Sequence, residues 1–181
     1  YTLMMFVSAV IIVVYTAVGG FLAESTIDSI QGTLMFFALI FVLVAGTVAT
    51  GGIGAVGQNI NELPGFFDIF AVMDTATKSE IPFGALSIIS ALAWGLGYFG
   101  MPHILLRFMA IRTTDEIKRS KIIAMIWVII SLGVAVLIGI VGRAYLGEVL
   151  SGADSEKIFV EMSIKLIPSL LAGVILSAIL A

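Results

Sequence analysis

The residues best suited to binding chemistry lie in one apolar stretch that glycine and proline interrupt. Residues 94–102 read WGLGYFGMP. Trp94, Tyr98 and Pro102 are spaced four residues apart and share one face of a helix. Each glycine weakens a helix by about 1 kcal/mol, and an interior proline by about 3 kcal/mol. Backbone groups freed at such a break inside a membrane need protein, water or a ligand as partner, so the stretch is a candidate ligand site.

Helix packing explains the same residues without a ligand. Small residues let helices approach closely, and aromatic side chains anchor helices at the membrane surface. Trp94 lies deep within its apolar segment, however, and an anchor at the membrane surface is expected near a segment end. A binding site around Gly97 and packing through small residues therefore both remain open.

Asp28 is the second candidate, because a carboxylate inside an apolar segment is costly and usually functional. Glu24 lies one turn before it and Gln31 three residues after it. Side-chain oxygens of Ser25, Thr26, Asp28 or Gln31 suit a monovalent cation. Ser25 or Thr26 is also a normal N-cap, and acids stabilise helix N-termini. A cation ligand and a helix-terminus acid both remain open for Asp28.

Other polar residues in the apolar segments have ordinary explanations. His103 is expected to be a hydrogen-bonded packing residue rather than a proton relay. Arg107 and Arg112 are explained by snorkelling and topology. The sequence has one histidine and no cysteine, which excludes a multi-histidine metal site, zinc–thiolate chemistry and disulfides within it.

The elements that position these residues are apolar segments of membrane-spanning length. Of the 181 residues 60% are hydrophobic, mean hydropathy is +1.18, and 12% are charged, against roughly 25% in soluble domains. Lipid must solvate part of this surface, so a lipid bilayer is an expected partner. A net charge of −3 indicates no nucleic-acid partner. We expect an all-α integral membrane protein with about five transmembrane helices. The segments are residues 1–18, 26–50, 83–109, 122–141 and a fifth that starts after residue 168.

Positive charges predict the orientation of these segments. Five of the nine lysines and arginines lie around the third connection, which is therefore expected in the cytoplasm. They are Arg107, Arg112, Lys118, Arg119 and Lys121. Alternation places the short connection FLAES (residues 21–25) on the same side and the glycine-rich connection 51–81 outside. Residues 151–168 are expected to form a short interfacial amphipathic helix that Pro168 ends.

Two passages resemble one known family. WGLGYFGMPHILLRFMAIR (residues 94–112) and YTAVGGFLAESTIDSIQG (residues 15–32) resemble signature regions of the sodium:solute symporters, in particular the sodium/proline symporter branch. Met101 stands where that branch has glutamine, and Thr26 is displaced from its usual place beside the aspartate. The resemblance covers essentially the whole chain.

The resemblance implies a leucine-transporter-type fold of two inverted five-helix repeats. Residues 1–181 would be an internal fragment, a single transmembrane domain with the last two core helices of repeat one and the first three of repeat two. The third segment would be discontinuous or bent, and the fifth truncated. Trp94, Tyr98 and Pro102 are then implied in substrate binding and Asp28 in sodium handling on the cytoplasmic side. The main sodium site would lie outside this chain.

The implied function is sodium-coupled symport of a small solute, foremost proline, by alternating access. The protein would be multi-pass in the cell inner (plasma) membrane, with sodium as coupling ion and no other metal or cofactor. Trp94 and Tyr98 would line an aromatic wall for a pyrrolidine ring, and the backbone from Gly97 to Pro102 would meet its polar end. Another amino acid, a carboxylate or pantothenate is the alternative solute.

Two other function classes fit the sequence less well. A channel needs a continuous polar pore lining, which these segments lack. An enzyme inside the membrane needs a catalytic pair, whereas Asp28 and His103 are far apart in sequence and each stands alone. We therefore expect a transporter rather than an enzyme.

Overall fold

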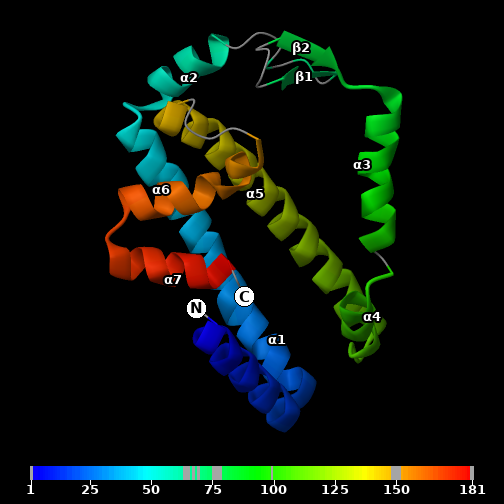
Figure 1. The fold of residues 1–181 in the computed structure, drawn as a ribbon. Coiled ribbons are helices and arrows are strands. Elements are labelled where there is room, and N and C mark those ends of the chain that lie inside the picture. The colour runs from blue at the N-terminus through cyan, green and yellow to red at the C-terminus, as the bar shows by residue number, and fades with distance from the viewer. Residues whose placement is uncertain are drawn as a thin grey trace.

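A computed structural model describes residues 2–62, 66, 68, 70–74, 79–98, 100–147 and 152–179. Helices dominate it, and one small hairpin of two strands lies at one end (Figure 1). In chain order the elements are α1 (Thr2–Ala49), α2 (Ile53–Asn61), β1 (Ala71–Asp74), β2 (Ser79–Pro82), α3 (Ala85–Tyr98), α4 (Pro102–Met109), α5 (Thr114–Leu146), the 3₁₀ helix η2 (Gly152–Lys157), α6 (Ile158–Leu166) and α7 (Ser169–Ile179).

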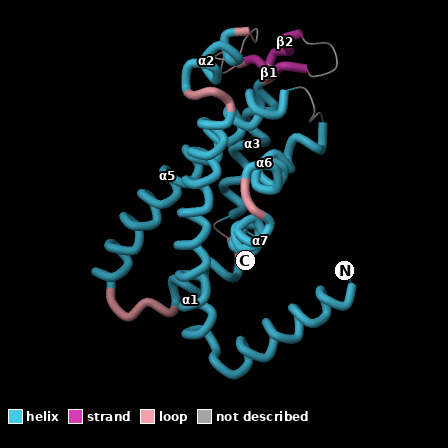
Figure 2. The backbone as a smooth tube through the Cα atoms, turned by 90° about the vertical axis from the view of Figure 1, so that its left-hand side faces the viewer, coloured by secondary structure: helices cyan, strands magenta, loops and turns pink. Residues whose placement is uncertain are grey.

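A sharp bend at Gly20 divides α1 into two arms (Figure 2). Gly20 has φ 56° and ψ −153°, a conformation that costs a residue with a Cβ and that glycine adopts freely. The prediction of a loop at residues 21–25 (FLAES) is wrong, because these residues are helical and Gly20 makes the turn by itself. The helical run Leu3–Ala49 has 47 residues, about 70 Å of helix, whereas a bilayer core is about 30 Å thick.

The structure contains fewer helices of membrane-spanning length than the five segments predicted from the sequence. Among the described residues two helices are long and apolar enough to cross a membrane, Leu3–Ala49 and Thr114–Leu146, and the bent pair α3–α4 makes up to three. The difference from about five arises because α1 is one helical run across its bend. In addition, the described part of α7 is an apolar helix shorter than a span.

The core lies where α1, α5, α6 and α7 meet. Val42, Ile138 and Met162 are fully buried there. Met162 of α6 fits over two glycines, Gly46 of α1 and Gly142 of α5, where a Cβ atom would collide with its side chain. Small residues on two long helices thus let α6 cross both at close range.

α5 begins earlier and ends later than the predicted segment 122–141. Its N-cap is Thr113, whose hydroxyl accepts a hydrogen bond from the Glu116 N–H at 3.4 Å. Glu116 Oε2 in turn accepts from the Arg112 N–H at 3.3 Å. This arrangement is close to a capping box, and Asp115 adds a second acid to the first turn. The cap therefore starts the helix two turns before its apolar run.

The short helix predicted within residues 151–168 is confirmed in η2 and α6. α6 ends at Leu166, just before Pro168. Its buried residues are Met162, which lies against Gly46 of α1 and Gly142 of α5, and Ser163, while the partly exposed Glu161 and Lys165 pair at 3.7 Å. Its amphipathic pattern therefore reflects packing against neighbouring helices.

The connection 51–81 contains regular structure that the sequence analysis missed. α2 packs against α5 with Val56 buried, and β1 pairs antiparallel with β2, Ala71 opposite Pro82. The all-α expectation is wrong in this one detail. The bend in α1 and the α4–α5 connection lie at the same end of the molecule, opposite α2 and the hairpin, as the predicted alternation of the segments requires (Figures 1 and 2).

Candidate functional site

The predicted break in the third segment is confirmed. α3 ends at Tyr98, α4 begins at Pro102, and the two axes differ by 43°. The N–H of Gly100 donates to Gly97 O at 3.1 Å and that of Met101 to Tyr98 O at 3.2 Å, tightening the last turn of α3. Met101 is extended, as expected before proline. Phe99, between these residues, lies outside the described part of the chain.

Aromatic rings line the break on one side. Trp94 and Tyr98 stack with centroids 5.6 Å apart at 29°, which confirms that they share a face. His103, beyond the break, meets Tyr98 edge-on at 6.1 Å. Trp94 is 75% exposed and Tyr98 46% exposed, so the flat ring surface is open to a ligand or to other protein.

The break is not enclosed by the packed helices. Among the described residues of α3 and α4 none is buried. Gly97 has open space where a Cβ would point, and Pro102 is exposed. Figure 1 shows α3 standing apart from α1 and α5. Of the residues predicted for substrate binding, Trp94 and Tyr98 therefore stack on an open face, and Gly97 and Pro102 are exposed at the break.

Asp28 lies inside a continuous helix rather than at a helix start. The second arm of α1 begins directly after Gly20, and Asp28 is eight residues further on. Thr26 Oγ1 donates to Leu22 O at 2.8 Å, back along the same helix. An N-cap at Ser25 or Thr26 is therefore wrong, and the helix dipole, which acts within the first turn, does not explain Asp28.

Asp28 forms an ion pair with Arg107 of α4, a partner that the sequence analysis missed. The side chains of Asp28 and Arg107 are 36% and 56% exposed. The sequence analysis explained Arg107 by snorkelling and topology. The sequence does contain a signal for this pair, namely two opposite charges within apolar segments, because such charges tend to pair with each other. The structure does not bring Asp28 to the rings: its partner lies five residues beyond Pro102, about 7.5 Å along α4.

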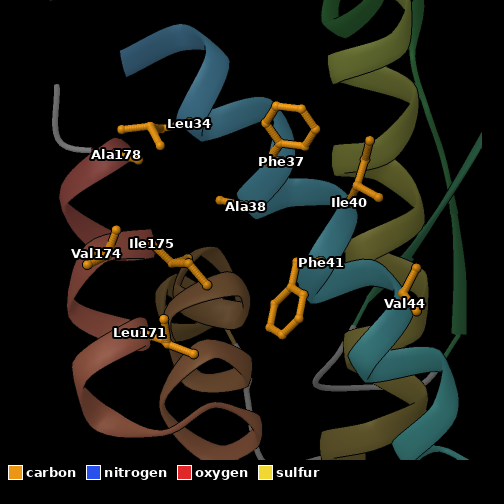
Figure 3. Close-up of a pocket in the computed structure, with 10 residues that line it drawn as sticks. All are labelled: Leu34, Phe37, Ala38, Ile40, Phe41, Val44, Leu171, Val174, Ile175 and Ala178. Atoms are coloured by element: carbon orange, nitrogen blue, oxygen red, sulfur yellow. The ribbon is translucent and has the colours of Figure 1, made fainter. Parts of the chain in front are cut away.

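The structure also contains an apolar cavity, away from the break, of about 490 Å³. It lies between α1 and α7 (Figure 3). Its lining side chains are all apolar: Leu34, Phe37, Ala38, Ile40, Phe41, Val44, Leu171, Val174, Ile175 and Ala178. A zwitterion or an ion buried there would lack hydrogen-bond partners, which is costly. The cavity is therefore a poorer candidate for a polar solute than the break.

Comparison with known proteins gives one family. The family model of the sodium:solute symporter family matches residues 1–181. The osmoregulated proline transporter OpuE of Bacillus subtilis is 40% identical over 100% of this chain and 35% of its own length. The high-affinity proline transporter PutP of Bacillus subtilis is 43% identical (94% and 34%), and the sodium/proline symporter of Escherichia coli 38% identical (93% and 33%). The chain thus spans about a third of these relatives. No solved structure matches it significantly.

Proposed function

Because this chain belongs to the sodium:solute symporter family, we propose that it is part of a transporter that couples inward sodium movement to uptake of proline. The observation that carries the proposal is the 38–43% identity, over nearly the whole chain, to three proteins named as proline transporters or a sodium/proline symporter. Another amino acid, a carboxylate or pantothenate is the second candidate solute, which Met101 keeps open.

The break in α3–α4 suits a zwitterion with an apolar ring. The C-terminal end of α3 carries partial negative charge and the N-terminal end of α4 partial positive charge. An ammonium group would meet the first and a carboxylate the second, within the span Gly97 to Pro102. The stacked Trp94 and Tyr98 would then cover the pyrrolidine ring, and the Tyr98 hydroxyl offers one further hydrogen bond.

The proposed architecture is the leucine-transporter type with inverted repeats. The two arms of α1 would be the last core helices of repeat one, and α3–α4, α5 and α7 the first of repeat two, within a single domain. The protein would be multi-pass in the plasma membrane with the α4–α5 connection in the cytoplasm. Support comes from the shared end of the α1 bend and the α4–α5 connection, as alternation requires (Figures 1 and 2).

Sodium would act as coupling ion, with Asp28 on its path, and we propose no other cofactor. Coupling requires that sodium bind one conformation better than another and so favour the state that takes up solute. A carboxylate near the expected cytoplasmic end of a span and away from the aromatic face suits this role better than solute recognition. Asp28→Asn should accordingly change the sodium requirement more than the affinity for proline.

The test is uptake of labelled proline by the full-length protein in proteoliposomes, with an inward sodium gradient or with choline in its place. We expect uptake only with sodium and competition by unlabelled proline. Equal uptake in choline would contradict sodium coupling. Sodium-driven uptake of a different solute, with no competition by proline, would replace proline by the second candidate.

A further inference from the structure

The Asp28–Arg107 ion pair joins two parts of the chain that are otherwise hardly packed together. The partners are 79 residues apart in sequence. Asp28 belongs to α1, whose second arm packs along α5, whereas Arg107 belongs to α4, in which no described residue is buried. A charge pair, rather than an apolar contact, thus attaches the half-helix beyond the break to the packed helices.

Each partner of the ion pair follows a discontinuity in the backbone. Asp28 is eight residues beyond the bend at Gly20, and Arg107 is five residues beyond Pro102, where α4 begins. About two turns further along α1, Phe36 packs on Trp127 of α5, and one turn further a Cβ at Gly32 would lie in van der Waals contact with the same ring, so the α1 side of the pair is anchored. On the α4 side no described residue is buried, and Arg107 provides an ion pair to α1.

The chemistry of Asp28 makes this attachment removable. A carboxylate is the natural ligand of both a guanidinium and a sodium ion, and two cations held at one carboxylate repel each other. Sodium at Asp28 therefore weakens the hold of Arg107, and the reverse holds by linkage. Because both side chains are partly exposed, the pair is weak enough to be exchanged.

We propose that Arg107 is a positioning residue: its guanidinium ties α4 to α1 through Asp28, and a sodium ion that takes the Asp28 carboxylate releases α4. This inference rests on the proposed sodium-coupled transport. It connects the ion to the solute site, because α4 is the half-helix whose N-terminus faces the break between Tyr98 and Pro102.

The first experiment measures sodium half-saturation of proline uptake in the full-length protein. Arg107→Gln removes the competitor, so half-saturation should fall about two- to fivefold, the range for an exposed ion pair. Arg107→Lys keeps a positive charge and should stay near wild type. Arg112→Gln is the matched control at the same end of the molecule and should change nothing. An Arg107→Gln value equal to the Arg112→Gln value would overturn the tie.

The second experiment tests whether Arg107 acts through Asp28. In an Asp28→Asn background the carboxylate that both cations share is gone. Arg107→Gln should then have no further effect on sodium half-saturation. An equal shift in both backgrounds would show that Arg107 acts elsewhere and would overturn the proposal.

A third measurement reports on release directly and does not depend on uptake. In a cysteine-free full-length background, a single Phe108→Cys next to the intact pair reports on the exposure of α4, and Arg107→Leu added to that background removes the tie. Thiol labelling at Phe108→Cys should be faster in sodium than in choline, and this difference should vanish in Arg107→Leu. Equal labelling in both ions with the pair intact would overturn the release step.

The outcomes separate this inference from the function on which it rests. Wild-type uptake that ignores sodium would overturn the proposed function itself. Sodium-dependent uptake in wild type, with Arg107→Gln unchanged, would leave the function standing and overturn only the tie.

Discussion

The packed helices and the broken pair α3–α4 use similar apolar sequence in opposite ways. In the packed region Gly46 and Gly142 receive the side chain of Met162, which is completely buried. In the broken pair Gly95 and Gly97 have no side chain against them. The same residue type thus closes a helix contact in one region and leaves room in the other. A glycine-rich apolar run therefore indicates a candidate ligand site only where no side chain fills the space.

This difference separates stability from recognition. The packed region buries its large residues and should determine whether the protein folds. The broken pair exposes Trp94 and Tyr98 and should determine what the protein binds. Substitutions in the two regions are therefore expected to change different measured quantities, and a crossed result would remove the distinction.

The largest effect is expected from Met162→Ala in the packed region. Truncating a fully buried side chain leaves a cavity and typically costs about 2 to 5 kcal/mol of unfolding free energy. The thermal unfolding midpoint of the purified full-length protein should fall clearly. Ile164→Ala on the same helix, where the side chain is largely exposed, is the control and should change the midpoint little. A large loss of proline affinity in folded Met162→Ala would break the comparison.

Next in size are Trp94→Ala and Tyr98→Ala in the broken pair. Each should raise the KM for proline roughly 10- to 100-fold, about 1.4 to 3 kcal/mol, because part of a flat binding wall is lost. Their unfolding midpoints should stay near wild type, since neither ring is buried. Trp127→Ala removes the ring packed on Phe36 at 5.2 Å. It should lower the unfolding midpoint and leave the KM for proline near wild type. Wild-type KM in both site variants would place the solute elsewhere.

Local features of the fold were predictable from the sequence. The break before Pro102 and the end of α6 before Pro168 follow from proline and glycine placement, which acts on the nearest turns. The stacking of Trp94 on Tyr98 follows from helical spacing. In contrast, the first segment was expected to end at residue 18 and to be followed by a loop, because the sequence does not reveal that one glycine with positive φ reverses the chain while the helix continues on both sides.

Features that join distant residues were not predictable in the same way. Arg107 was explained by its position at a segment end, and no local pattern records an ion pair across 79 residues. The strands Ala71–Asp74 and Ser79–Pro82 were missed because each has only four residues, too few to show the alternating apolar pattern of a half-buried strand.

A smaller effect is expected from Gly20→Ala at the bend of α1. Alanine in the left-handed region costs roughly 1 to 2 kcal/mol, although nothing lies where its Cβ would point. The unfolding midpoint should fall by less than in Met162→Ala. Gly54→Ala in α2, where the Cβ also meets open space and φ is negative, is the control. Equal midpoints for the two variants would mean that the bend does not depend on Gly20.

The smallest effect is expected from the exposed pair Asp154 and Lys157, which precedes α6 at the edge of the packed region. Lys157 Nζ donates to Asp154 Oδ1 at 2.7 Å. This hydrogen bond, and then the lysine charge, lower the pKa of Asp154 below its usual 3.8, and the same contact raises the pKa of Lys157 above its usual 10.5.

The contribution of Asp154 to stability is complete at pH values above 3.8 and is lost as the pH falls through the lowered pKa. The lysine contribution is complete below 10.5 and is lost as pH rises through the raised pKa. The difference in unfolding midpoint between wild type and Asp154→Asn should therefore be small and constant near neutral pH and should shrink in acid, with Glu156→Gln as the control on the same turn. A difference that grows as the solution becomes acidic would mean that the pair does not support η2 by its charge.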